Sequence, residues 1–302
     1  MNTGPFKTDI AIIGHLAKDL IEIDGKIVES LGGGVYYGAL AGNQMGLKIV
    51  IITRLKKADW RMLEVFNNNG IQVFATATEE TSGIHNIYSS NNMEFRKYIP
   101  LGFAGHFRIS EIPLLDTKFF VIGSIVAGEV ELDLFRYLAT KYSNNLCVDI
   151  QGFIRVRSQK ELFYKDLNEQ EKKEILSKTK VLKVDQTELK ILTKETRIKE
   201  GAKLLKTLGP KEILITHEKG ISVLTDDEYI TFPWKNKSSL GRTGRGDTAF
   251  IGYLGSRINN NPTDSLKFSA ALTSLKIESS GAFSLPINLV NDLIKREYSN
   301  KS

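Results

Sequence analysis

The chain has 302 residues, 41% of them hydrophobic and 25% charged, enough to form the core of one large globular domain spanning 1–302. Its single cysteine, Cys147, excludes an internal disulfide, and no run approaches the roughly 20 apolar residues of a membrane helix. The net charge is +6, but basic residues alternate with acidic ones, which argues against a nucleic-acid surface. The amino-terminal stretch lacks the pattern of a secretory signal, so a cytoplasmic protein is expected.

Buried strands and helices are predicted to alternate along the chain. Short apolar runs rich in β-branched residues predict strands at 9–14, 48–55, 119–124, 145–150, 181–185 and 212–217. Helical spacing of apolar residues predicts helices at 35–46, 57–69, 129–142, 187–207, 246–258 and 264–279. This alternation is typical of a doubly wound α/β fold, a mostly parallel sheet with helices on both faces. Ligands of such folds gather at the carboxyl ends of the strands.

Two segments alternate between apolar and polar residues at period two instead. The segment 20–29 surrounds Asp24-Gly25, a strong hairpin signal, and 84–99 has the same pattern. No predicted helix covers them, so we expect a small antiparallel β sheet outside the main one. It is either a pair of surface hairpins or a lid over a site, formed by about 15–31 and 82–104. If the lid strands have exposed edges, a homodimer would cover them.

The stretch GRTGRGDTAF, residues 241–250, leads into a predicted helix and carries the first candidate site. Gly244 and Gly246 permit a tight turn and a close approach of the backbone to a ligand. The free N–H groups of the helix and its dipole, equivalent to about +0.5 charge, favour an anion such as phosphate. The same dipole stabilises the negative charge of the Asp247 carboxylate. The structural alternative is that Asp247 only caps the helix after the turn.

This stretch resembles the signature D-x-T-G-A-G-D-x-F of the ribokinase-like, PfkB-type, carbohydrate kinases. The matching residues are Thr243, Gly244, Gly246, Asp247 and Phe250. Two positions differ, since Gly241 replaces the first aspartate and Arg245 replaces the alanine. Two interpretations of Arg245 are open. Its side chain points into solvent, or its guanidinium reaches the transferred phosphate or an acidic acceptor.

Further elements match the family in order along the chain. GHLAKDL carries Asp19, where the family keeps an acid for substrate hydroxyls. LGGGVYYGALAGNQMG (31–46) resembles its Gly-Gly hinge and substrate helix, with Tyr37 where asparagine is usual. VDQTE (184–188) is similar to the N-x-x-E element, and ILITHEKG (213–220) to the strand and loop beside the nucleotide. The resemblance covers nearly the whole chain and implies a ribokinase-like fold.

The resemblance also implies a transferase that moves the γ-phosphoryl group of ATP to a hydroxyl of a small molecule. Asp247 would be the general base, and the backbone of Gly244, Arg245 and Gly246 would form the anion hole. The residues expected to bind the nucleotide are Asp185, Thr216, Gly220 and Thr243. Those expected to bind the acceptor are Asp19, Gly32, Gly33, Tyr37 and Gln151.

A magnesium ion on the nucleotide phosphates is implied as well. Asp185 and Glu188 would hold it, through water, because carboxylate oxygens suit Mg²⁺. The structural alternative is that both are ordinary acids in the first turn of a helix. For Thr216 and Gly220 the alternative is an ordinary strand and turn.

The acceptor is predicted to be polyhydroxylated, because a carboxylate such as Asp19 accepts pairs of hydrogen bonds from hydroxyls. VESLGGG (28–34) and VDIQGFIR (148–155) resemble inositol kinases more than ribokinases or fructokinases, so a sugar or inositol-like cyclitol is expected. One alternative is a nucleoside kinase, with a base stacked on Tyr36, Tyr37 or Phe103. Another is a non-catalytic sugar- or nucleotide-binding protein of this fold.

Overall fold

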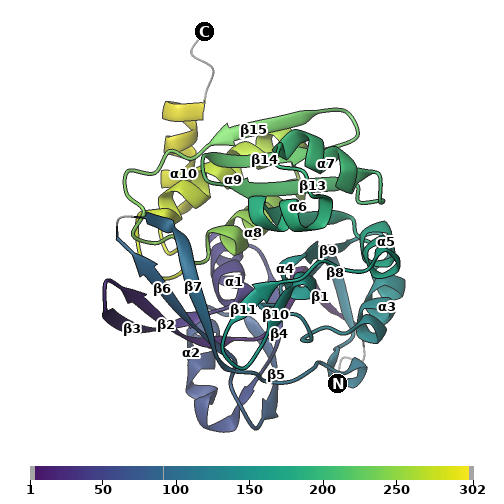
Figure 1. Cartoon of the computed structure of the whole chain (residues 1–302), viewed down its shortest axis with the longest axis vertical. Helices are drawn as coiled ribbons and strands as arrows, with labels where there is room; N and C mark the ends of the chain where they lie inside the picture. Colours follow the sequence, from purple (N-terminus) through teal and green to yellow (C-terminus); the bar gives the residue numbers. More distant parts are fainter. Residues whose placement is uncertain (1–3, 91, 299–302) are drawn as a thin grey trace.

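A computed structural model describes residues 4–90 and 92–298 and contains a nine-stranded sheet, ordered β15-β14-β13-β12-β9-β8-β1-β4-β5 (Figure 1). Neighbours from β13 to β5 pair in parallel, and β14 and β15 at one edge are antiparallel. The strands are β1 Phe6–Ile13, β4 Ile49–Lys56, β5 Gln72–Thr78, β8 Leu115–Ile122, β9 Leu146–Asp149, β12 Val181–Asp185, β13 Glu212–His217, β14 Gly220–Leu224 and β15 Tyr229–Pro233. The predicted mostly parallel sheet is therefore confirmed.

Helices cover both faces of this sheet. One face carries α1 Gly34–Gln44, α8 Arg245–Arg257, α9 Pro262–Ile277 and α10 Ile287–Leu293. The other carries α3 Leu132–Lys141, α5 Glu169–Ser177, α6 Gln186–Thr193 and α7 Ile198–Lys206. Shorter helical segments are η1 Lys57–Leu63, α2 Glu64–Asn67, η2 Ile109–Glu111, α4 Gln151–Ile154 and η3 Ile294–Tyr298.

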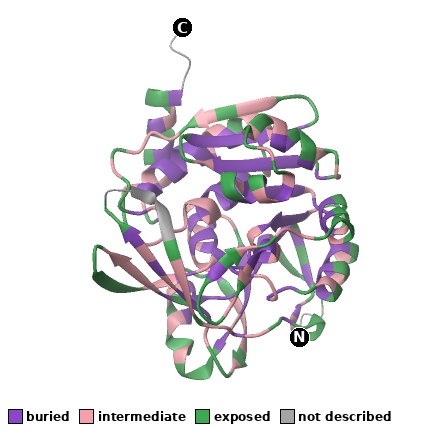
Figure 2. Cartoon of the chain, viewed as in Figure 1, coloured by how far each residue is buried: buried purple, intermediate pink, exposed green. Residues whose placement is uncertain are grey.

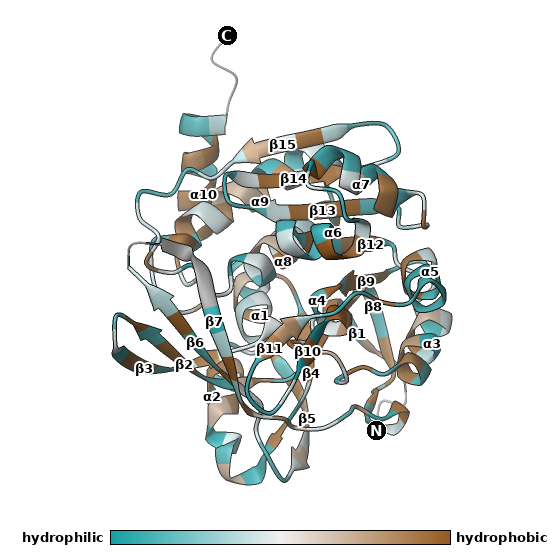
Figure 3. Cartoon of the chain, viewed as in Figure 1, coloured by the Kyte–Doolittle hydropathy of each residue, from teal (hydrophilic) through white to brown (hydrophobic). Residues whose placement is uncertain are grey.

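The central strand β1 shows why the fold has two cores. Ile10 and Ile12 pack into the core with α1 and α8, whereas Ala11 and Ile13 pack into the core with α3 and α6. All four side chains are at most 1% exposed. A strand buried on both faces carries apolar residues at successive positions, which explains the unbroken apolar run in the sequence. Figure 3 shows the same hydrophobic character along β9 and β13.

The helix predicted over 187–207 is in fact two helices. Lys194 has a φ of 61° and ends α6 in the left-handed conformation, and α7 begins at Ile198. The polar stretch TKETR, 193–197, interrupts the apolar spacing at this break, so the prediction wrongly joined two helical patterns. The segment predicted as a helix over 57–69 is likewise divided, into η1 and α2.

The predicted small sheet, called the lid from here on whether or not it moves, consists of four strands in the order β3-β2-β6-β7. They are β2 Ala17–Ile23, β3 Lys26–Gly32, β6 Gly83–Ser89 and β7 Asn92–Gly102. Each hairpin is antiparallel, as predicted, and Asp24 and Gly25 turn the first with positive φ values. The two hairpins join through β2 and β6, which pair in parallel, so the sheet is mixed at its centre. Asn91, within the predicted lid segment, lies outside the described residues.

The outer lid strand β3 is largely exposed, as Figure 2 shows. Ile27 and Val28 on this edge are 54% and 63% exposed.

Short β10 Arg155–Arg157 and β11 Leu162–Tyr164 form a separate two-stranded sheet. In the described part of the chain, no helix combines the length and apolar character needed to cross a bilayer.

Candidate active site

The turn before α8 is formed by the glycines of the sequence signature. Gly244 has a φ of 80° and is the N-cap of the helix, in a left-handed conformation that favours glycine. The Arg245 N–H donates to the Arg242 carbonyl over 3.2 Å. The N–H groups of Gly246 and Asp247 belong to the first helical turn, where no helical carbonyl is available to them. Together with the dipole of this 13-residue helix, they favour an anion.

Two pockets meet at this helix end. The polar pocket, of about 300 Å³, is lined by Tyr98, Gln151, Tyr164, Lys183, Asp185, Thr187, Thr216, Arg242, Gly244, Arg245, Gly246 and Asp247. The lid pocket, of about 50 Å³, is lined by Asp19, Gly33, Gly34, Tyr37, Ile84, Asn86, Ile125, Gln151, Arg155, Thr243, Gly244 and Asp247. Gln151, Gly244 and Asp247 line both pockets, so the Asp247 carboxylate lies at the boundary between them.

The N-terminus of α1 packs closely against Asp247. A Cβ atom on Gly34 would lie 3.2 Å from Asp247 Oδ1 and 2.5 Å from the Gly123 carbonyl oxygen. Only glycine fits this position without moving the loop after β8. The close contact therefore places the Asp247 carboxylate beside the lid pocket.

Lys183 is a buried cation below the polar pocket. Its Nζ lies 3.0 Å from Asp149 Oδ2 and 3.6 Å from Glu188 Oε2. Burial opposes its charge, but Asp149 and Glu188 more than compensate and raise the Lys183 pKa. The same Nζ lies 3.2 Å from the position that a Cβ on Gly246 would take. A positive charge is thus held directly beneath the N-terminus of α8.

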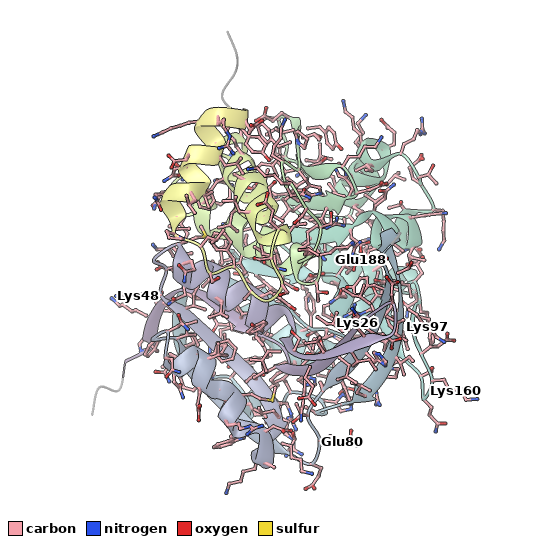
Figure 4. All side chains as sticks on the ribbon, turned by 90° about the vertical axis from the view of Figure 1, so that its left-hand side faces the viewer. Lys26, Lys48, Glu80, Lys97, Lys160 and Glu188 are labelled. Atoms are coloured by element: carbon pink, nitrogen blue, oxygen red, sulfur yellow. The ribbon has the colours of Figure 1, made fainter. Side chains whose placement is uncertain are left out.

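Asp185 and Glu188, the predicted magnesium ligands, form a capping box at the start of α6. Asp185 Oδ1 accepts from the Glu188 N–H over 2.8 Å, and Glu188 Oε2 accepts from the Asp185 N–H over 2.6 Å. This geometry agrees with the alternative interpretation, in which both acids stabilise the first turn of a helix. Burial, and next the charge of Asp185, raise the pKa of Glu188 to about 8. Figure 4 shows Glu188 inside the fold, whereas Lys48 and Lys160 extend outward.

This arrangement also fits a hydrated Mg²⁺. Asp185 lines the polar pocket, and the buried Glu188 Oε1 has no hydrogen-bond partner among the described atoms. Magnesium keeps several waters and takes one or two carboxylates together with substrate phosphates. No cluster of three or more His, Cys, Asp or Glu that could hold a metal occurs in the described residues. An ion here would therefore need phosphate oxygens from a ligand.

Asp19 lies in the lid pocket, as its predicted substrate role requires. Its Oδ1 accepts from the Ile84 N–H over 2.8 Å, which ties β2 to β6. A Cβ on Gly32 would lie 2.0 Å from Asp19 Oδ2, so glycine makes room for this carboxylate. Gly33, with a φ of 93°, lies against the His15 carbonyl and lines the pocket. The predicted acceptor residues of 31–46 therefore gather around Asp19.

A buried carboxylate fixes another wall of the lid pocket. Glu129 accepts from the N–H groups of His15, Ile125 and Val126 over 2.8, 2.6 and 3.0 Å. Burial raises its pKa to about 7. Arg155 Nε donates to the Ile125 carbonyl over 2.8 Å. Because Ile125 and Arg155 line the pocket, this network holds a cation at the acceptor end of the site.

The predicted nucleotide-binding residues are divided between different places. Thr216, at the end of β13, lines the polar pocket. Gly220 does not line it. Its Cβ would lie 2.2 Å from the Phe232 carbonyl oxygen, so glycine is needed there for β14 to pack against β15. Thr243 lines the lid pocket instead, and its hydroxyl shares a 2.8 Å hydrogen bond with Tyr88 of the lid.

Several charged residues of the site were missed from the sequence. They are Asp149, Arg155, Lys183 and Arg242, which line the pockets or pair with residues that do. A signal existed for two of them. Lys183 interrupts the apolar run VLKVD, and Asp149 ends the run NLCVD at the carboxyl edge of the sheet. A charge inside a buried strand indicates a paired or functional group.

Comparisons with known proteins identify kinases. No protein-family model matches the chain. The sequence is 28% identical over 270 residues to the cytidine kinase of Thermococcus kodakarensis, covering 85% of this chain and 91% of that enzyme.

Two solved structures are similar over nearly the whole chain. A sulfate complex of a pyrophosphate-dependent kinase in the ribokinase family has a TM-score of 0.86 and 30% identity, covering 93% of this chain and 99% of that one. A pyrophosphate-dependent kinase of that family, complexed with a pyrophosphate analog and myo-inositol, has a TM-score of 0.85 and 29% identity, covering 94% and 99%.

The position of Arg245 leads to a binding prediction. Its side chain lines the polar pocket, with the guanidinium carbon 5.9 Å from the Trp234 ring centre. Arg245→Ala should weaken the binding of a phosphate-type anion, with pyrophosphate as the probe, about tenfold, the rough contribution of one charge-assisted hydrogen bond. Arg245→Lys, which keeps the positive charge, should lose less of this affinity. Isothermal titration calorimetry measures both, and unchanged affinity in the alanine variant would favour the solvent-facing interpretation.

Proposed function

The chain is a kinase of the ribokinase family, a phosphotransferase with a hydroxyl acceptor, and we propose that it phosphorylates a cyclitol or sugar with pyrophosphate as donor. The observation that most strongly supports this proposal is the position of Asp247, which lines both the polar pocket and the lid pocket. The polar pocket suits an anion, and the lid pocket offers hydrogen-bonding side chains. A base is needed at that boundary, because the acceptor hydroxyl must lose its proton as it meets the phosphorus.

In this reaction the acceptor hydroxyl gives its proton to the Asp247 carboxylate, and its oxygen bonds to the terminal phosphorus. The bond from that phosphorus to the bridging oxygen breaks, and orthophosphate leaves. The N–H groups of Gly246 and Asp247, with Lys183 below, stabilise the charge on the moving group. Mg²⁺ near Asp185, when bound, would supply further positive charge to the donor phosphates.

The lining of the polar pocket supports pyrophosphate. Lys183, Arg242 and Arg245 are three cations around about 300 Å³, beside the N-terminus of α8. This chemistry suits a compact donor that consists only of phosphate. The solved kinases with similar sequences depend on pyrophosphate, which supports the same donor here. ATP, expected from the family signature, stays a prediction, with Thr216 in the pocket as its support.

The lid pocket supports a cyclitol or sugar over a nucleoside. Asp19, Asn86, Gln151 and Arg155 offer hydrogen bonds to hydroxyls from several sides. The three rings considered for base stacking have other contacts. Tyr36 packs edge-on to Tyr37, Tyr37 is covered by Gly244, and Phe103 contacts His15 and the Arg157 guanidinium.

A donor and acceptor panel tests this proposal. The full chain is incubated with Mg²⁺ and either pyrophosphate or ATP, together with myo-inositol, ribose, fructose, cytidine or adenosine. Phosphorus-31 NMR detects the phosphomonoester. We expect product from pyrophosphate with the cyclitol or a sugar. Product from ATP with a nucleoside alone would contradict both the donor and the acceptor.

Asp247→Asn should lower kcat by about 10²–10⁴-fold, the usual worth of acid–base catalysis, with donor affinity close to wild type. Asp264→Asn is a matched control, because Asp264 also lies in the first turn of its helix, α9. It removes a carboxylate from a helix N-terminus without touching either pocket. If both variants keep wild-type turnover, Asp247 only stabilises the helix.

Asp19→Asn should raise the acceptor KM roughly 10- to 100-fold and leave the donor KM unchanged, since a hydrogen bond to a charged group contributes about 1.5–3 kcal/mol. The asparagine oxygen can still accept from the Ile84 N–H, so the lid pairing is preserved. Asp24→Asn, at the exposed hairpin turn, is the control. An unchanged acceptor KM would place the acceptor elsewhere.

A further inference from the structure

Lys276, near the end of α9, is a second buried lysine beside the catalytic turn. It is 1% exposed. Its Nζ donates to the Gly241 carbonyl and, over 2.5 Å, to the Thr243 carbonyl. Both carbonyls belong to the turn 241–244 that precedes α8. One ammonium group therefore joins the start and the end of the turn whose last residue caps the helix.

Tyr37 completes the support of this turn. The Lys276 Nζ lies 5.1 Å from the centre of the Tyr37 ring, within the range of a cation–π interaction. A Cβ on Gly244 would lie 2.2 Å from two atoms of the same ring. The backbone at Gly244 thus rests on one aromatic ring, and the ammonium rests beside it. We define Lys276 and Tyr37 as the turn support.

The turn support explains two departures from the family signature together. Gly241 stands where an aspartate is usual, and its Cβ would lie 1.6 Å from the Ser279 carbonyl oxygen. Its N–H donates to the Ile277 carbonyl over 2.7 Å, so the turn runs directly along the end of α9. Tyr37 stands where an asparagine is usual. Both departures contact Lys276 or the backbone around it.

The charge on Lys276 is not balanced by a neighbouring ion pair. Among the described side chains, no carboxylate lies within 4.0 Å of its Nζ, which contacts two backbone carbonyls and an aromatic ring. Burial lowers its pKa to about 7, while Asp247 favours the charged form. Burying a cation in this way costs stability, so a purely structural tie would be better made by a neutral donor.

We propose that Lys276 is a positioning residue, a built-in cation that holds the 241–244 turn so that the N-terminus of α8 can bind the donor phosphate. It acts through the turn and touches no reacting atom. The inference rests on the proposed function for its effect on turnover. Its effect on anion binding does not depend on that function, because the helix N-terminus binds an anion whether or not transfer follows.

The test compares Lys276→Met with Lys267→Met, a lysine on the same helix that pairs with Asp264 at the surface. Thermal unfolding first confirms that each variant folds. Calorimetry then measures pyrophosphate binding, and steady-state kinetics measure kcat and both KM values. We expect Lys276→Met to lose about tenfold in pyrophosphate affinity and at least tenfold in kcat, with the acceptor KM unchanged. Lys267→Met should match wild type.

Rescue separates the charge from the packing. Methylammonium is small enough to enter the space of the missing ammonium and donates hydrogen bonds, whereas tetramethylammonium donates none. Methylammonium alone should restore part of the pyrophosphate affinity of Lys276→Met. Pyrophosphate affinity of the folded variant within twofold of wild type, or equal recovery with both cations, would overturn the proposal.

If Lys276→Met does not fold, Lys276→Gln takes its place, because its amide keeps a donor near the carbonyls without the charge. Wild-type pyrophosphate affinity in that variant would overturn the role of the cation. The two proposals also fail differently. Wild-type protein that binds pyrophosphate but transfers nothing contradicts the proposed function, while the affinity difference between the lysine variants still decides the role of Lys276.

Discussion

The site depends on the close approach of two helix N-termini, those of α1 and α8, with the Asp247 carboxylate between them. Gly34 and Gly244 allow it, since a side chain at either position would meet backbone or an aromatic ring at 2.5 Å or less. The distance between the two pockets is set by this contact. Phosphoryl transfer needs donor and acceptor held at bonding distance, so the glycines fix geometry at the step where position matters most.

Charge is distributed around the same turn in a definite order. Lys183 lies beneath Gly246 and is balanced by Asp149 and Glu188, whereas Lys276 lies behind the preceding turn without a paired carboxylate. Lys183 is therefore anchored to strand β12 of the sheet, and Lys276 to helix α9, which packs beside α8. A phosphate at the end of α8 would meet both fields. Lys183 therefore lies at the polar pocket itself, whereas Lys276 acts on it only through the turn 241–244.

Much of the fold follows from local sequence, because strands buried on both faces need unbroken apolar runs and these were easily recognised. The break at Lys194 was missed although 193–197 is wholly polar, because the helical patterns on either side were joined into one. The antiparallel edge strands β14 and β15 were missed although both are short runs rich in β-branched or aromatic residues. The resemblance to the family signature predicted the turn, and it implied Asp19 because the family keeps an acid after its first strand. Lys276 and Arg155 were missed because their burial is decided by segments far away in the sequence, and charged residues are ordinarily exposed.

The hydrogen bond between the hydroxyls of Tyr88 and Thr243 affects how much donor is lost to reaction with water. It joins the lid to the catalytic turn, so the lid cannot lift without removing a contact from that turn. Water competes with the acceptor for any activated phosphate, and it is most abundant when the lid is open. If the lid opens during turnover, loss of the Tyr88–Thr243 hydrogen bond would leave the turn less firmly held at that moment. Transfer of the phosphoryl group to water would then be disfavoured by the loss of one hydrogen bond.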